Sequence, residues 1–406
     1  MGETVRYLEQ WEKRRTMPLW REAFWEDTEE FLEYYYKEKS SDNRILVMEE
    51  GDRIVSMVHR NPYRLRLGGR EADIDYIVAV ATASDRRHRG YMRKLLLKML
   101  NDMGREKMAF CFLMPADRRI YEPFGFAFIY DQEHWKLTKE AEQGLAKEKV
   151  DSDTAALAAE WMDRWLGQRY QVWAVRDKRY ADRLLLELAS ENGWLELLYQ
   201  KERPGGGPVG IRGWWGIGKT EQRLLLCGSE YREEQRRPCP AIMARIGDVK
   251  TCLELISLKK DSLLDRLEVT LHVEDRMCGW NQGTFLWKLD RRGSLVMEEA
   301  EGEENGMGGR GCLFITIEDL TQWIFGYREL EELADREELA ACAKAAVPKE
   351  PVSRDRPGFD LGMRPGDAAR HVQEESDQRT YREETVTIRW WREIGVWKKV
   401  FLDEIV

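Results

Sequence analysis

Residues 76–114 alternate between strand-like and helix-like patterns in an order that few folds accommodate. The run Tyr76–Thr82 is rich in β-branched and apolar residues and predicts a buried strand. The run Ala109–Met114 predicts a second one. Between them, apolar side chains recur at the spacing of one helix face: Met92, Leu95, Leu96, Met99, Leu100 and Met103. Because strand–helix–strand crossovers are right-handed, we expect the two strands to be parallel neighbours in one sheet.

A basic loop, Arg86-Arg87-His88-Arg89-Gly90, joins the first strand to the helix. A helix that begins here exposes backbone N–H groups that have no intrahelical partner, and its dipole adds positive potential. Gly90 allows the backbone to come close to phosphate oxygens because it has no Cβ. We therefore expect this helix start to bind an anion such as a pyrophosphate.

The bulk properties limit the class of protein. A chain of 406 residues exceeds what one hydrophobic core usually supports, so two or three domains are expected. With 65 basic and 74 acidic side chains, the net charge of −9 disfavours a nucleic-acid partner. No apolar run approaches the roughly 20 residues that cross a bilayer, and no signal peptide is evident. Seven cysteines without metal spacing indicate reduced thiols. We expect a cytoplasmic protein without a membrane partner.

The rest of the chain alternates helices and strands, which predicts a mixed α/β chain of the α+β class. Amphipathic helices are expected around 155–166 and 180–191, and strand-like runs follow at 194–199 and 223–227. A further unit is expected from Ala241, with strands at 267–273, 284–289 and 313–317 and a helix at 320–325. The polar stretch 346–385 predicts a long loop or insertion, and Val396–Val406 alternates like a strand.

Two short motifs resemble the Gcn5-related N-acetyltransferase (GNAT) superfamily. Arg87-x-x-Gly90-x-Met92 resembles its acetyl-CoA signature, with Met92 in a position that is normally small. Tyr121-x-x-Phe124-Gly125-Phe126 resembles a segment that follows downstream in that fold. The two motifs occur in the family's order.

The whole chain resembles the Eis-type (enhanced intracellular survival) branch. The resemblance implies tandem GNAT domains followed by a sterol-carrier-protein-like domain. The expected domains are residues 1–138 (acetyl-CoA binding), 139–240 (a degenerate second GNAT domain) and 241–406 (sterol-carrier-protein-like, with a C-terminal strand that reaches the active site). It also implies a symmetric homo-oligomer, a hexamer.

The resemblance implies the roles of individual residues. The co-substrate acetyl-CoA would be held by Val80, Ala81, Thr82, Arg87, His88, Arg89, Gly90, Tyr91, Met92, Arg93, Ala116 and Asp117. Tyr121 would be the general acid that protonates the CoA sulfur, which suits a phenol that is protonated at neutral pH. The α-carboxylate of Val406 would be the general base, since a desolvated carboxylate becomes more basic.

The acceptor is expected to be an amine. An aromatic and acidic helix around Phe24, Trp25, Glu26 and Asp27 is expected to form part of the acceptor pocket, where carboxylates would attract a cation. An aminoglycoside-like compound, a polyamine or a protein lysine would each fit.

Two other classes of protein compete with this interpretation. Gly213–Thr220 fits the phosphate-loop motif Gly-x4-Gly-Lys-Ser/Thr, but the sequence around it lacks the preceding buried strand and the following helix, so we expect a hairpin. The C-terminal unit could instead bind a lipid in a non-catalytic carrier. We expect no metal, because His59, His134, His272 and His371 lack ligand spacing.

Overall fold

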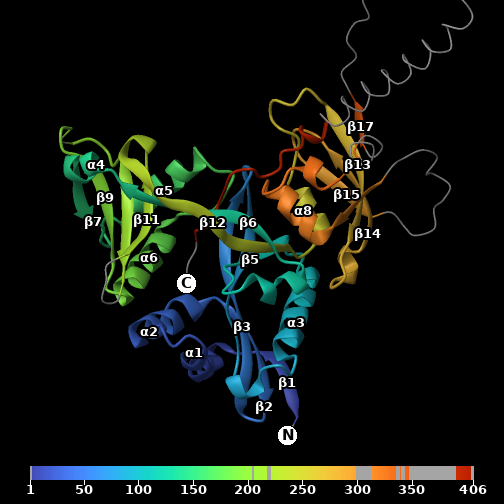
Figure 1. Cartoon of the computed structure of the whole chain (residues 1–406), viewed down its shortest axis with the longest axis horizontal. Coiled ribbons are helices and arrows are strands. Elements are labelled where there is room, and N and C mark those ends of the chain that lie inside the picture. Colours follow the sequence, from blue (N-terminus) through green and yellow to red (C-terminus); the bar gives the residue numbers. More distant parts are fainter. Residues whose placement is uncertain are drawn as a thin grey trace, which may run out of the picture. The chain divides into compact units, whose positions relative to one another are not determined.

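Two structural units make up the part of the chain that the computed structural model describes, residues 2–203, 205–216, 221–298, 312–334, 339, 343–346 and 390–403 (Figure 1). The first unit comprises Met1–Gly247 together with Trp397–Val406. The second comprises Asp248–Val396.

The main sheet of the first unit has the strand order β1-β2-β3-β4-β5-β12-β6. These strands are β1 (Glu3–Tyr7), β2 (Arg44–Glu50), β3 (Arg53–Leu67), β4 (Arg70–Thr82), β5 (Phe110–Leu113), β6 (Ala127–Leu137) and β12 (Arg232–Ile246). Neighbours along this order run antiparallel except β4 and β5, which are parallel. The predicted parallel pair is therefore confirmed.

Helices cover both faces of this sheet (Figure 1). Helices α1 (Met17–Ala23) and α2 (Glu29–Lys37) pack on one face, where their aromatic side chains share a core with residues of β2, β3 and β4. Helix α3 (Tyr91–Arg105) packs on the other face. Its predicted apolar stripe is confirmed, since five members are fully buried: Leu95, Leu96, Met99, Leu100 and Met103.

A second lobe follows within the first unit. Its sheet has the order β11-β10-β9-β7 and is antiparallel throughout. The strands are β7 (Leu145–Lys149), β9 (Trp194–Gln200), β10 (Gly210–Trp215) and β11 (Glu221–Cys227), and the helices are α4 (Lys139–Gly144), α5 (Ala155–Gly167) and α6 (Lys178–Ser190). The short strand β8 (Val172–Ala174) leaves this lobe and pairs with β3.

Strand β12 returns the chain from the second lobe to the main sheet. It pairs with β6 along most of its length and with β5 from Met243 to Ile246. The boundary expected between residues 240 and 241 falls inside this strand, so Ala241–Ile246 lie in the main sheet.

The C-terminal segment from Trp397 also belongs to the first unit. The expectation of a strand over Val396–Val406 is wrong in extent, because within the described residues only β18 (Val400–Phe401) is a strand, parallel to β8. Just before it, the backbone N–H groups of Lys398 and Lys399 donate to the side-chain oxygen of Gln171, and these bonds replace strand pairing. Residues 404–406 lie outside the described residues.

The second unit is an α+β fold. It contains α7 (Val249–Glu254), β13 (Arg266–Glu274), β14 (Gly283–Leu289), β15 (Ser294–Glu298), β16 (Leu313–Thr316), α8 (Ile317–Ile324) and β17 (Ala343–Ala346), close to the predicted elements. Trp323 packs against both Trp287 and Trp391 in its interior, each pair in a T-shaped, edge-to-face arrangement. The polar stretch 346–385 lies outside the described residues except Ala346. No helix in the described ranges combines the length and apolar character that a membrane crossing needs.

Candidate active site

Strands β4 and β5 separate beyond Tyr76. Their pairing is limited to Asp75↔Cys111 and Tyr76↔Phe112, whereas the other edge of β4 stays paired with β3 as far as Thr82. Before its end, β4 contains a bulge in which Ala79 has a φ of +49°. Bulges redirect the backbone and are common beside functional sites. The β5-facing edge of Val80–Thr82 pairs with no strand of the described chain. The Ala81 carbonyl accepts from the Ser56 hydroxyl (2.8 Å), and the Thr82 carbonyl accepts from Nε of Arg87 (3.4 Å).

The start of α3 forms an open site with positive potential. Gly90 caps the helix with a φ of +77°, a conformation that favours glycine, and a Cβ built there would meet nothing within 4 Å. Arg87, His88 and Arg89 are all exposed beside it. The predicted anion site is therefore accessible, and the residues present suit a pyrophosphate.

The predicted cofactor residues differ in how they are held. The Tyr91 hydroxyl donates to Glu3 (2.9 Å) and Glu50 (2.6 Å), so this side chain ties the helix to the sheet. Met92 is half-buried, and Arg93 is exposed with its guanidinium 5.9 Å from the ring of Phe124. These contacts make Tyr91 a supporting residue of the anion site.

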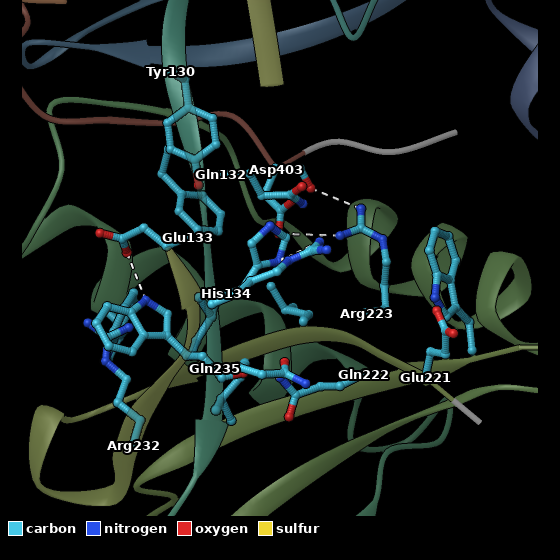
Figure 2. Close-up of a pocket in the computed structure, with 18 of the residues that line it drawn as sticks. Tyr130, Gln132, Glu133, His134, Glu221, Gln222, Arg223, Arg232, Gln235 and Asp403 are labelled. Atoms are coloured by element: carbon cyan, nitrogen blue, oxygen red, sulfur yellow. Dashed lines mark hydrogen bonds and ion pairs between the residues drawn. The ribbon is translucent and has the colours of Figure 1, made fainter. Parts of the chain in front are cut away.

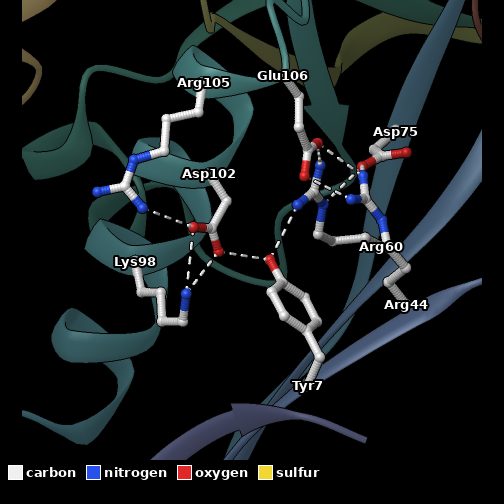
Figure 3. A network of polar contacts seen from close by, with 8 residues as sticks. All are labelled: Tyr7, Arg44, Arg60, Asp75, Lys98, Asp102, Arg105 and Glu106. Atoms are coloured by element: carbon white, nitrogen blue, oxygen red, sulfur yellow. Dashed lines mark hydrogen bonds and ion pairs between the residues drawn. The ribbon is translucent and has the colours of Figure 1, made fainter. Parts of the chain in front are cut away.

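At the end of α3 opposite to the anion site, a polar network around the buried Arg60 anchors the helix (Figure 3). The Arg60 guanidinium, fully buried in β3, donates to Asp75 of β4 (2.6 Å), Tyr7 of β1 (2.9 Å) and Glu106 just after α3 (2.7 Å). The Tyr7 hydroxyl in turn donates to Asp102 of α3 (3.0 Å). One arginine thus joins three strands to the helix that carries the anion site.

Tyr121 lies between two short 3-10 helices, Arg118–Ile120 and Glu122–Phe124. Its ring packs against Phe126 at a centroid distance of 5.8 Å, and burial raises the pKa of its hydroxyl to about 12. The phenol therefore keeps its proton at neutral pH. Nearby, Ala116 is exposed, and Asp117 is engaged as the cap of the first 3-10 helix, accepting from the N–H of Arg119.

The predicted acceptor residues lie in the turn between α1 and α2, so the expectation of a helix around them is wrong. Phe24 ends α1 with a non-helical backbone (φ −126°, ψ 61°), and α2 begins only at Glu29. Phe24 packs against Trp20, whereas Trp25 is 77% exposed and Glu26 is exposed as well. Asp27 accepts a hydrogen bond from the Trp20 indole (2.7 Å), and burial raises the pKa of its carboxyl.

Carboxylates of the second lobe lie near Asp27. The Tyr34 hydroxyl of α2 donates to Glu187 of α6 (3.2 Å), so the two helices are in contact. Burial, followed by the negative charges of Glu187 and Asp27, raises the pKa of Glu191 to about 6, against the opposing charge of Arg223. The sequence analysis missed Glu187, Glu191 and Arg223, because no local spacing marks residues that meet across two lobes.

His59, which the sequence analysis treated as isolated, is buried behind the acceptor segment. Its ring lies 5.3 Å from that of Trp20, and its Nδ1 shares a hydrogen bond with the Tyr35 hydroxyl (3.0 Å). Burial, aided by the charge of Lys13, lowers its pKa to about 3, so the imidazole is neutral. It packs and hydrogen-bonds in the core of the acceptor side.

The structure contradicts the phosphate-loop alternative, because a strand and not a helix follows the motif. Gly213–Trp215 end β10, and the chain returns antiparallel as β11 from Glu221, as the predicted hairpin requires. A phosphate loop needs a helix at that point. Residues 217–220 and the predicted base Val406 lie outside the described residues.

Two segments match known protein families. Residues 4–129 match the acetyltransferase (GNAT) domain, and residues 249–350 match the sterol carrier protein domain. The chain therefore contains a GNAT acetyltransferase domain followed by a sterol-carrier-protein-like domain. The predicted resemblance, the mixed α+β fold class and the acetyltransferase class of enzyme are confirmed at this level.

Solved structures share the fold over most of the chain. A probable N-acyltransferase from Enterococcus faecalis has a TM-score of 0.67 at 18% identity, covering 82% of this chain and 92% of its own. A GCN5-related N-acetyltransferase from Anabaena variabilis has a TM-score of 0.63 at 16% identity, covering 84% and 94%. Eis1 from Mycobacterium abscessus has a TM-score of 0.57 at 11% identity, covering 86% and 94%. No curated protein matches the chain in sequence.

Proposed function

We propose that this chain is an acetyl-CoA-dependent N-acetyltransferase. It would acetylate a primary amine of a small cationic acceptor, aminoglycoside-like or a polyamine, or of a protein lysine. The observation that carries the proposal is the separation of β4 from β5 at a bulge, directly before an open, basic helix start.

The chain's own residues suit the parts of acetyl-CoA. The edge of Val80, Ala81 and Thr82 that β5 leaves unpaired beside the bulge suits an extended amide-bearing arm. The N–H groups at the start of α3, with Arg87, His88 and Arg89, suit the pyrophosphate. Half-buried Met92 would pack beside them, where a smaller side chain is usual in this family.

Acetyl transfer needs one proton donor and one proton acceptor. The amine nitrogen attacks the thioester carbon, the C–S bond breaks, and the departing thiolate takes a proton. In the proposal Tyr121 donates that proton, and its buried, protonated phenol supports this role. The amine gives up its own proton to the α-carboxylate of Val406.

The tail that precedes Val406 limits where its carboxylate can act. The described tail ends at Asp403, in the second lobe, beside Arg223. Three further residues reach at most about 10 Å, which limits where the carboxylate can act.

The charges on the acceptor side support a cationic acceptor. After burial, the negative charges of Glu187 and Asp27 raise the pKa of Glu191 across the two lobes. An ammonium group placed among them would relieve their mutual repulsion.

The proposal also includes a cytoplasmic homo-oligomer, which is hexameric by resemblance. Light scattering after size-exclusion chromatography tests this oligomeric state.

Calorimetry with acetyl-CoA separates this proposal from a lipid carrier. The enzyme is expected to bind acetyl-CoA and to lose most of that affinity in Gly90→Val, which cannot adopt the positive φ easily. Absence of binding by the wild type would remove the enzyme interpretation.

A variant extended by one residue after Val406 tests the proposed general base, because displacing the carboxylate should lower kcat. An unchanged kcat would refute that role.

A further inference from the structure

The C-terminal tail, Trp397–Asp403, is fixed to the first unit at several points. Trp397 is 1% exposed and packs over Gly68, where an added Cβ would lie 3.0 Å from the indole nitrogen. Phe401 joins the hydrophobic core of the second lobe. These contacts bring the tail to the second lobe, with β18 paired to β8.

The described end of the tail is held by polar contacts (Figure 2). The Asp403 carboxylate pairs with Arg223 of β11 (3.3 Å) and accepts from Gln132 of β6 (2.7 Å). Arg223 also donates to the backbone carbonyl of Asp403 (2.9 Å). The side chains of Arg223 and Asp403 are only 5% and 11% exposed, so the pair is shielded from water and weakly screened.

The backbone of β11 is irregular at Arg223. Gly213 of β10 faces Leu224 and Trp214 faces Gln222, which leaves Arg223 as the extra residue of a bulge. A bulge changes the direction of a side chain relative to a regular strand. Arg223 lines a cavity of about 180 Å³ together with Trp215, Gln132 and Asp403.

Arg223 also lies on the acceptor side, where it lines a second cavity, of about 150 Å³, together with Glu187. Its positive charge opposes the burial and the negative charges that raise the pKa of Glu191. The same guanidinium therefore contacts the tail and influences the charge state of the acceptor side.

We propose that Arg223 is a positioning residue that fixes the tail at Asp403 and couples it electrostatically to the acceptor carboxylates. This inference rests on the proposed function, because the tail and these carboxylates matter to catalysis only if the chain acetylates an amine. Arg223 itself touches neither reactant in this scheme.

Arg212 offers a matched control. It lies on the neighbouring strand β10 in regular register, is equally buried, and pairs with Glu196 (2.5 Å) and Glu142 (2.7 Å). Like Arg223, it stacks near a tryptophan, Trp214 at 4.5 Å compared with Trp215 at 5.4 Å. It has no contact with the tail within the described residues.

The test compares Arg223→Gln, Arg223→Lys and Arg212→Gln in the full chain by two readouts. The first is hydrogen–deuterium exchange at residues 397–403, which needs no substrate. The second is steady-state acetyl-CoA turnover across pH 5–9, with spermidine and kanamycin as the amine probes. Arg223→Gln should raise tail exchange at least tenfold, lower kcat/KM at least tenfold and shift the acidic limb of the profile to higher pH.

The conservative and control variants make the inference falsifiable. Arg223→Lys should recover part of the tail protection and part of the kcat/KM that Arg223→Gln loses, because a positive charge returns near Asp403 and Glu191. Arg212→Gln should leave tail exchange and the shape of the pH profile unchanged, even if it lowers stability. Unchanged tail exchange in Arg223→Gln would overturn the inference. So would equal effects of the Arg223 and Arg212 changes on the pH profile. If Arg223→Gln increases tail exchange but the wild type shows no turnover, the tail contact is supported and the proposed function is contradicted.

Discussion

The lobe built on β1–β6 and the lobe built on β7 and β9–β11 both pack helices on antiparallel sheets, but they differ at one point. In the first lobe, the parallel strands β4 and β5 separate beyond Tyr76, ahead of the bulge at Ala79 and the basic start of α3. The second lobe has an antiparallel sheet with a bulge at Arg223, and it contributes the carboxylates of Glu187 and Glu191. In the proposed function, the first lobe binds acetyl-CoA, and Glu187 and Glu191 of the second lobe act with Asp27 of the first lobe to recognise the cation.

The largest effect is expected at Tyr121. Tyr121→Phe keeps the ring that packs against Phe126 but removes the proton donor, so kcat should fall about a hundredfold or more with little change in either KM. Steady-state kinetics with varied acetyl-CoA and varied amine measures this. A kcat close to that of the wild type would show that the thiolate takes its proton elsewhere.

Loss of the network around Arg60 is expected to lower mainly the stability of the protein. Arg60→Met leaves the buried Asp75 carboxylate without its closest partner, so the free energy of unfolding should fall by about 3 kcal/mol. Urea denaturation measures this. Because the same network anchors α3, affinity for acetyl-CoA should fall too, whereas Arg212→Met in the second lobe should lower stability alone. Equal loss of acetyl-CoA affinity in both variants would contradict the division between lobes.

The same network predicts an acid-sensitive contribution to stability. Burial alone would raise the pKa of Glu106, but hydrogen bonds from Arg44 and Arg60 lower it from its ordinary 4.5 to about 2. A lowered folded-state pKa stabilises the protein above pH 4.5, and this contribution is lost as the pH falls towards 2. Glu106→Gln should therefore flatten the pH dependence of the unfolding free energy between these limits. An unchanged slope would show that the ion pairs contribute nothing.

A smaller effect is expected at the anion site. The double variant Arg87→Ala/Arg89→Ala removes two exposed cations, so the Kd for acetyl-CoA should rise about tenfold, or roughly 1.4 kcal/mol. Stability should not change because both side chains are exposed. Calorimetry at low and high salt measures this, and the difference from wild type should shrink as salt rises. A shift in the KM for the amine instead would reverse the assignment of the lobes.

The smallest effect is expected at Glu191. Its pKa is raised from 4.5 to about 6, so it weakens the folded state as the pH rises through that range. Glu191→Gln should therefore raise the unfolding free energy at pH 7 by about 1 kcal/mol or less. It should also raise the KM for the amine a few-fold and flatten its dependence on pH between 5 and 7. An unchanged KM for the amine at all pH values would exclude Glu191 from acceptor binding.

The sequence predicts the first lobe better than the second, for a physical reason. The parallel strands, the apolar stripe of α3 and the basic loop are local patterns within 76–114, so periodicity and spacing are sufficient to find them. Glu191 and Arg223 acquire their properties only where two lobes and the tail meet. The bulge that isolates Arg223 depends on pairing with β10, which no local pattern encodes. The C-terminal strand is shorter than the sequence predicts because the backbone N–H groups of Lys398 and Lys399 donate to the side chain of Gln171 and not to a neighbouring strand.

Acetyl transfer itself is tested most directly by incubating the full chain with acetyl-CoA and a panel of polyamines, aminoglycosides and lysine peptides. CoA release and the mass of each amine are followed together. We predict that at least one amine gains a single acetyl group in step with CoA release, and that Tyr121→Phe slows both equally. Release of CoA without any acetylated amine, or no release with any member of the panel, would contradict the account.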